Sequence, residues 1–271
     1  MRKTAVTVII LVLLAGFLWG CSPKEKKGPN RLEISRFFEA VARNRMDTVR
    51  GILDRDPSII RAVDANGDTA LHVCAAEGNR AMADLLISGG VDVDVANNFG
   101  LTPLHLAATA GNTSLAELLL DRGAKIDPTA RIVNLSPEMA QIDKEATPLH
   151  KAAQYGRTGV TALLLRRGAP ADPRDLDERT PLHEASLRGH TGVVRLLLDY
   201  GGSPEARDAN QQTPLHNASA TGSRDIVMML LNKGANPRAT DKSGRTPQAL
   251  ARYNGHEEIV ELLENYDRNN P

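Results

Sequence analysis

The chain has 271 residues, of which 41% are hydrophobic, and this excludes a wholly disordered protein. Only 3% are aromatic, so a core must be built mainly from small and aliphatic side chains, as in stacked helices. The 33 Lys and Arg residues balance the 33 Asp and Glu residues, which argues against a general nucleic-acid-binding surface because such a surface needs excess positive charge.

The first twenty residues have the layout of an export signal. Arg2 and Lys3 precede an uncharged run over residues 5–19, and a positive start followed by an apolar run is typical of a secretory signal. The run is shorter than the roughly 20 apolar residues that cross a membrane as a helix. Residues 4–23 together form a longer uncharged segment, so an uncleaved signal anchor that leaves the repeats facing the cytoplasm is the alternative.

The end of this run carries a more specific pattern, in which Leu18, Trp19 and Gly20 lead into Cys21. The pattern resembles the signal of bacterial lipoproteins, although Trp19 stands where that family usually has a smaller residue. The resemblance implies that residues 1–20 are a signal peptide cleaved before Cys21, and that Cys21 is the lipidation site. Several acyl chains on one residue would anchor the protein stably, whereas a single chain binds only marginally.

The residue after the cysteine bears on where the protein is delivered. Ser22 resembles the default of that family, which is export to the outer membrane. We therefore expect a lipid-anchored protein of the cell envelope, on the periplasmic face of the outer membrane or the extracytoplasmic face of the cell membrane. Polar residues with Pro23, Gly28 and Pro29 follow, and they predict a flexible tether over residues 21–31.

A four-residue motif recurs through the rest of the chain. It reads Thr-Ala-Leu-His in the first copy, Thr-Pro-Leu-His in the next four and Thr-Pro-Gln-Ala in the last. The copies begin at Thr69, Thr102, Thr147, Thr180, Thr213 and Thr246. Their successive spacings are 33, 45, 33, 33 and 33 residues, and this period and motif resemble the ankyrin repeat family.

Each repeat also contains the signals for two helices. Thr is a good N-cap and Pro suits the first helical turn, while a Gly nine residues after each Thr can end that helix in a left-handed conformation. An apolar triplet such as residues 196–198 and a second Gly follow. We predict an all-α ankyrin repeat solenoid of stacked helix-turn-helix units joined by β-hairpin-like loops.

The repeat pattern sets the expected domain boundaries. An atypical unit over residues 32–65 caps the N-terminus, five full repeats occupy residues 66–242, and residues 243–271 form a C-terminal capping repeat in which Glu264 replaces an apolar triplet member. The longer spacing reflects an insertion at about residues 128–143. It is either a specificity loop that contacts a partner or a tolerated surface loop, since lengthening a loop costs little.

The residues that could act as metal ligands or nucleophiles all occupy regular positions of the repeat. The ankyrin resemblance implies that the signature His residues are structural hydrogen-bonding groups between neighbouring units, and Cys74 occupies a small apolar position. Histidines one repeat apart do not form a zinc site, and no catalytic motif is present. We therefore expect no enzyme, cofactor or metal site, with a catalytic site in the insertion or on the concave face as the remote alternative.

The resemblance implies protein binding through the concave face, which the first helices and loop tips form. The positions four, seven and eight residues after Thr vary most among the central repeats, so the fold does not dictate them. The candidates at these positions are Lys151, Gln154, Tyr155, Glu184, Leu187, Arg188, Asn217, Ala220 and Thr221. The loop-tip candidates are Phe99, Leu101, Glu178 and Arg179.

These features together predict a membrane-tethered, monomeric protein that binds a protein partner in the bacterial cell envelope. A scaffold, an inhibitor or immunity factor, and an assembly factor all fit this prediction.

Overall fold

The computed structural model describes residues 30–130 and 145–270. This part of the chain contains fourteen α-helices, one 3-10 helix and no strand, and a single isolated bridge pairs Val63 with Thr69. The structure therefore confirms the all-α class and the stacked helix-turn-helix units. The predicted signal peptide, Cys21, most of the tether and residues 131–144 of the insertion lie outside the described residues.

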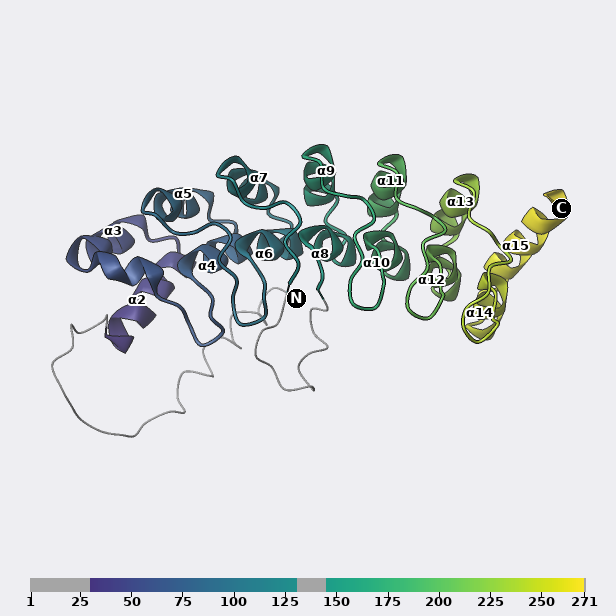
Figure 1. The fold of residues 1–271 in the computed structure, drawn as a ribbon, viewed down its shortest axis with the longest axis horizontal. Helices are drawn as coiled ribbons and strands as arrows, with labels where there is room; N and C mark the ends of the chain where they lie inside the picture. The colour runs from purple at the N-terminus through teal and green to yellow at the C-terminus, as the bar shows by residue number, and fades with distance from the viewer. Residues whose placement is uncertain (1–29, 131–144, 271) are drawn as a thin grey trace, which may run out of the picture.

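The helices form two parallel rows, with the connecting loops projecting beyond one of them (Figure 1). The row beside the loops holds the first helices, which are α4 (Ala70–Glu77), α6 (Pro103–Ala110), α8 (Pro148–Gln154), α10 (Pro181–Leu187), α12 (Pro214–Ala220) and α14 (Pro247–Tyr253). The other row holds the second helices, which are α5 (Arg80–Ser88), α7 (Thr113–Asp121), α9 (Thr158–Arg166), α11 (Thr191–Asp199), α13 (Arg224–Asn232) and α15 (Glu257–Asn269). Each helix packs against its counterpart in the next repeat, which gives an elongated stack.

The motif residues determine where the first helices begin and end. Thr180 is the N-cap of α10 in an extended conformation, and Pro181 occupies the first turn, where its missing N–H has no intrahelical partner. Gly189 follows the helix with φ +72°, a left-handed conformation that glycine adopts without steric cost. The other repeats show the same arrangement, except that Ala70 replaces the proline in the first, so the predicted helix boundaries are confirmed.

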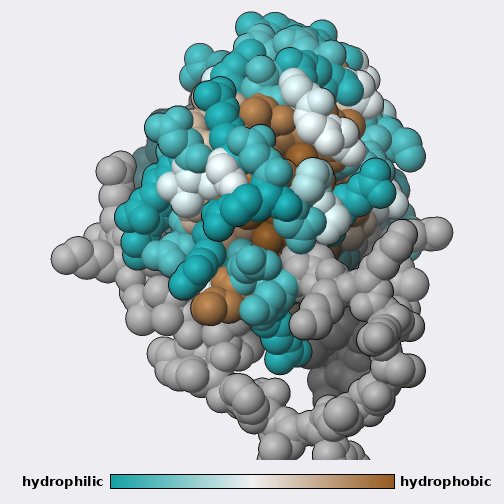
Figure 2. All heavy atoms as spheres, turned by 90° about the vertical axis from the view of Figure 1, so that its left-hand side faces the viewer, coloured by the Kyte–Doolittle hydropathy of each residue, from teal (hydrophilic) through white to brown (hydrophobic). Residues whose placement is uncertain are grey.

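The N-terminal unit consists of α2 (Arg31–Ala42), α3 (Met46–Arg55) and the short 3-10 helix η2 (Pro57–Arg61). The Asn30 side chain caps α2 by accepting a hydrogen bond from the backbone N–H of Leu32, so the helix begins at Arg31, the last residue of the predicted tether. Seen from this end, the described surface is mostly hydrophilic, with a few hydrophobic residues showing between (Figure 2). A polar outer face is what a terminal repeat requires.

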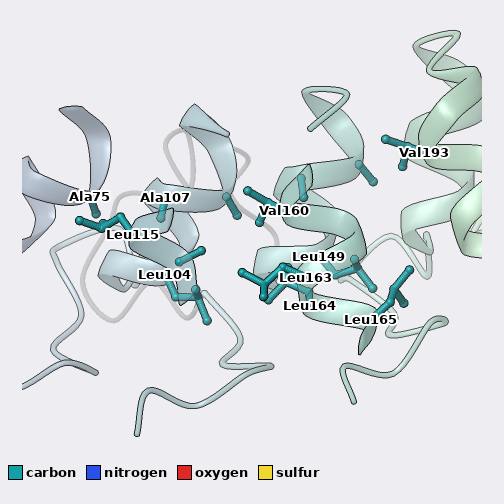
Figure 3. Close-up of a cluster of buried hydrophobic side chains, with 14 of the residues drawn as sticks. Ala75, Leu104, Ala107, Leu115, Leu149, Val160, Leu163, Leu164, Leu165 and Val193 are labelled. Carbon is teal, nitrogen blue, oxygen red and sulfur yellow. The ribbon is translucent and has the colours of Figure 1, made fainter. Parts of the chain in front are cut away.

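The core runs through the whole stack as one cluster of buried side chains. The middle member of each apolar triplet is fully or almost fully buried: Leu86, Leu119, Leu164, Leu197, Leu230 and Leu263. Figure 3 shows part of this core, where leucines from neighbouring repeats meet small residues such as Ala75 and Ala107. At the C-terminal end, Glu264 instead accepts hydrogen bonds from Gln248 and Arg252, which keeps the last outer face polar.

Candidate protein-binding surface

The signature histidines connect each first helix to the next repeat. In the second full repeat, Nδ1 of His105 accepts a hydrogen bond from the backbone N–H of Thr102 at 3.1 Å, so this nitrogen carries no proton. The proton is therefore on Nε2, which donates to the carbonyl oxygen of Ala146 at 2.9 Å. Equivalent bonds of 2.9–3.1 Å join His72, His150, His183 and His216 to the following repeat. The structural role predicted for these histidines is confirmed.

Burial keeps these histidines neutral and the cysteine unreactive. Burial is the main cause that lowers the pKa of His105 and of His183 to about 4. Burial also raises the pKa of the Cys74 thiol to about 12, so the nucleophilic thiolate is absent near neutral pH. Among residues 30–130 and 145–270, no three His, Cys, Asp or Glu side chains converge as metal ligands.

The loop tips, defined as residues 64–68, 97–101, 175–179, 208–212 and 241–245, share one hairpin-like conformation. The first residue of each donates its backbone N–H to the carbonyl of the fifth at 2.9–3.0 Å. Its side chain accepts two further backbone N–H bonds, as Asp208 does from Asn210 and Gln212 at 2.8 Å. Adjacent tips are also bonded to each other, for example from the Lys242 N–H to the Asn210 carbonyl at 2.9 Å. The tips therefore form a preorganised rim in two bonded parts, one made of residues 64–68 and 97–101 and the other of residues 175–179, 208–212 and 241–245.

The fourth residue of each tip has a left-handed backbone. Gly67, Gly100 and Gly244 occupy this position in the outer loops, whereas Glu178 and Gln211 adopt φ +59° and +60° in the central ones. A side chain in this conformation costs roughly 1–2 kcal/mol relative to the ordinary right-handed one. Two central loop tips therefore keep a side chain at a position where glycine would fit with less strain.

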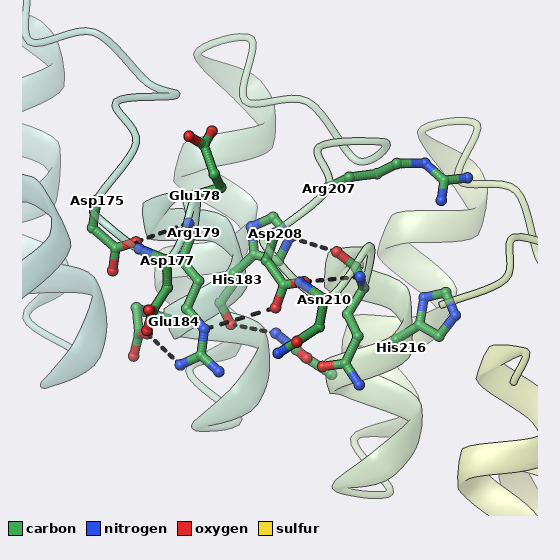
Figure 4. Close-up of polar contacts among 12 residues, drawn as sticks. Asp175, Asp177, Glu178, Arg179, His183, Glu184, Arg207, Asp208, Asn210 and His216 are labelled. Carbon is green, nitrogen blue, oxygen red and sulfur yellow. Dashed lines mark hydrogen bonds and ion pairs between the residues drawn. The ribbon is translucent and has the colours of Figure 1, made fainter. Parts of the chain in front are cut away.

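A network of charged side chains lies between the central loop tips and the first helices (Figure 4). The Arg179 guanidinium contacts the Glu184 carboxylate at 3.1 Å and the Asp208 carboxylate at 3.8 Å. Lys151 lies in the preceding repeat at the position equivalent to Glu184, and burial lowers its pKa although the charge of Glu184 opposes this. These groups come from three consecutive repeats, so they also fix the repeats relative to one another.

The structure separates the predicted contact residues into buried and exposed sets. The residues at position four, Lys151, Glu184 and Asn217, are only 9%, 8% and 4% exposed. This corrects the expectation that the fold does not dictate position four: Glu184 is held by Arg179, and Asn217 donates to the His183 carbonyl at 3.3 Å.

Positions seven and eight are more accessible. Tyr155, at 48%, and Arg188 are exposed, while Gln154 and Leu187 are partly exposed. In the loops, Glu178 is exposed, whereas Phe99, Leu101 and Arg179 are partly buried. The structure thus places the accessible candidates at the ends of the first helices and at one loop tip.

A comparison with known families agrees with this geometry. The profile described as "Ankyrin repeats (3 copies)" matches residues 37–132, 129–208 and 201–270, which is most of the chain. The chain belongs to the ankyrin repeat family. Ankyrin repeats are protein-interaction modules, so the surface just described is suited to a protein partner. No curated protein matches the chain.

Two exposed residues of this ankyrin repeat stack were missed from the sequence. Leu176 is 61% exposed beside Asp175 in a loop tip, and Tyr253 is 85% exposed at position seven of the C-terminal unit. Tyr253 could have been found by applying the register of the other repeats to the decayed motif after Thr246. Leu176 has no periodic signal, because the same loop position holds Ala, Asn or Lys in other repeats.

No helix within residues 30–130 or 145–270 combines the length and the apolar composition that spanning a membrane requires.

Proposed function

We propose that this protein binds a protein partner through the exposed ends of its first helices and the adjoining loop tips, with the central repeats forming the middle of the site. The observation that carries the proposal is the exposure of Tyr155 and Arg188 on adjacent first helices that are otherwise fixed by the histidine bonds. Tyr and Arg are, with Trp, the residue types most enriched among those that contribute strongly to binding energy at interfaces.

The rigid support of this surface favours binding. The rim of bonded loop tips and the network of Arg179, Glu184 and Asp208 hold the backbone in place before a partner arrives. A preorganised surface loses less conformational entropy on association, so more of the contact energy appears as affinity. A scaffold, an inhibitor or immunity factor, and an assembly factor would all use such a surface, and the identity of the partner decides among them.

We further propose that the chain acts at the bacterial cell envelope, tethered by lipid on Cys21. The support is the sequence alone: Arg2 and Lys3, the apolar run over residues 5–19, and the approach to Cys21. The intact mass of the protein from a bacterial host tests this. Loss of residues 1–20 with acyl chains added is expected, whereas a full-length mass with a free thiol would favour a signal anchor and a cytoplasm-facing adaptor.

The binding proposal is tested by crosslinked pull-down from envelope extract with the full chain as bait. The test variant is Tyr155→Ala with Arg188→Ala. The matched control is Tyr200→Ala with Arg195→Ala, because Tyr200 is 46% exposed and Arg195 is exposed on α11, in the row of second helices. A protein retained by wild type and control but lost with the test variant is expected. Retention by all three baits would move the site elsewhere.

A further inference from the structure

The exposed ends of the first helices form a stripe that contains one charge. We define the first-helix stripe as the residues at positions seven and eight from α8 to α14: Gln154, Tyr155, Leu187, Arg188, Ala220, Thr221, Tyr253 and Asn254. All are exposed or partly exposed, and every one except Arg188 is uncharged. The two tyrosines stand toward the two ends of the stripe, 48% and 85% exposed.

Arg188 has no ion pair within the described residues, although a carboxylate is close to it in sequence. Glu184 lies one helical turn earlier, a spacing at which opposite charges commonly pair. Its carboxylate instead contacts Arg179 at 3.1 Å, on the loop-tip side. The backbone N–H of Arg188 donates to the Glu184 and Ser186 carbonyls, whereas its guanidinium makes no hydrogen bond or ion pair with residues 30–130 or 145–270.

The other arginines of this surface are satisfied. Between residues 145 and 254, each other arginine in a loop tip or first helix, or just before a loop tip, contacts a carboxylate or a backbone carbonyl: Arg174, Arg179, Arg207, Arg245 and Arg252. Arg188 is therefore a cation without an ion pair among the described residues, in a stripe whose other seven residues are uncharged and which has a tyrosine toward each end. The complementary ligand carries a carboxylate there and apolar groups on either side.

We propose that the first-helix stripe binds an extended segment of the protein partner, with an Asp or Glu side chain of that segment pairing with Arg188. This inference rests on the proposed protein-binding function and names the chemistry of its ligand. A nucleic acid would need several cations along its path, and the stripe offers one. A guanidinium with free donors can bind a carboxylate in a bidentate manner, which fixes the register of the segment.

The spacing of the repeats predicts the spacing of the recognised residues. Packed helices lie roughly 8–10 Å apart, so the three steps from α8 to α14 span roughly 24–30 Å. An extended chain advances about 3.3 Å per residue and covers that span with about seven to nine residues. The acidic residue should therefore have an apolar neighbour about three residues away on one side, facing Tyr155. A second apolar residue should lie about five or six residues from the acidic residue on the other side, facing Tyr253.

The experiment selects binders from a displayed library of random linear 12-residue peptides on the full chain in detergent micelles. We expect enriched peptides to carry an Asp or Glu with apolar residues at those spacings. Their binding should weaken about tenfold or more with Arg188→Glu, since a hydrogen-bonded charge contributes more than an ordinary hydrogen bond. Arg195→Glu is the matched control, because Arg195 is exposed in the same repeat but lies on α11, and it should leave binding unchanged.

Charge reversal on the peptide completes the test. Replacing the enriched acidic residue by Lys should abolish binding to the wild-type protein and restore binding to the Arg188→Glu variant. Peptides without an acidic residue, or with binding that Arg188→Glu leaves unchanged, would overturn the inference, as would a library that yields no binder. The protein-binding function would still stand in each case if the pull-down loses its partner only with the Tyr155→Ala, Arg188→Ala bait.

Discussion

The buried histidines should make the stability of the repeat stack depend on pH. The folded-state pKa of His105 and of His183 is about 4, whereas an unfolded chain has histidines with a pKa near 6.5. The unfolded state therefore binds more protons than the folded state between these values. Stability contributed by the neutral histidines is fully present above about pH 6.5 and is lost as the pH falls toward 4.

The expected size of this effect follows from the two pKa values. Lowering the pH from 7.5 to 5.0 should remove roughly 2 kcal/mol of unfolding free energy for each of these two histidines, or about 4 kcal/mol together. Burial also lowers the pKa of His72, His150 and His216, so they add to the loss. Partial burial raises the pKa of carboxyls such as Asp172, and this stabilises the fold in more acidic solution. The effect of the histidines is therefore best measured above about pH 5.

The assay is urea unfolding of residues 30–271, followed by circular dichroism at a series of pH values. The diagnostic variant is His183→Ala, which should be less stable at pH 7.5. Its unfolding free energy should also vary less with pH than that of the wild type, by up to about 1.4 kcal/mol per pH unit, because one titrating group is gone. An identical pH dependence for the two proteins would refute the assignment of the effect to the buried histidines.

The remaining predictions concern stability. Leu197→Ala should lower the unfolding free energy by about 2–5 kcal/mol in urea titrations, because Leu197 is fully buried and its truncation leaves a cavity. Thr161→Val should raise it by about 1 kcal/mol, since the Thr161 hydroxyl is buried without a hydrogen bond. Gln211→Gly should raise the unfolding free energy by roughly 0.5 kcal/mol, because relief of the left-handed strain exceeds the entropy gained by the unfolded chain. An unchanged midpoint of the urea unfolding transition would contradict the gain expected for Thr161→Val or for Gln211→Gly. Amides of α10 and α12 should exchange hydrogen faster than those of α4 and α6, because α10 and α12 bury the Ser186 and Ser219 hydroxyls without a hydrogen bond among the described residues. Equal protection of the four helices would contradict this difference in local stability.

The sequence predicted the features of the fold that depend on local interactions. Thr180 and Pro181 begin a helix, and Gly189 ends one, through contacts within a few residues of each position, so these signals can be recognised without the structure. The period of 33 residues then carried the same prediction through all repeats. Tyr155 and Arg188 stand at position eight, which varies between the repeats, and both are exposed as that variation led us to expect.

The structure was needed where contacts join different repeats. The burial of Glu184 depends on Arg179, which reaches it from the loop tip, and the same arginine approaches Asp208 in the next loop. No pattern in the sequence indicates that Glu184 turns toward Arg179 and leaves Arg188, one turn later, without an ion pair among the described residues. The left-handed backbone of Gln211 was equally hidden, because the usual glycine is absent there.

The less favourable features of this chain are unevenly distributed along the stack. At position four the first two repeats place Val73 and Leu106, whereas the next three bury Lys151, Glu184 and Asn217. Buried polar groups are expensive unless every hydrogen bond is satisfied, while an aliphatic residue at the same position carries no such requirement.

The central repeats bear further costs of the same kind. Ser186 and Ser219 bury hydroxyls without hydrogen bonds at a position that holds Ala in the first three repeats, and Glu178 and Gln211 adopt the left-handed conformation. In a solenoid the stability is nearly a sum of local terms, so one repeat cannot offset such costs in another without loss of cooperativity. Departures from local consistency that persist in natural proteins are concentrated at functional sites. These departures lie in the three consecutive repeats of Thr147, Thr180 and Thr213, and the first two of these carry Tyr155 and Arg188. Their position therefore supports the proposal that the partner binds at the centre of the stack.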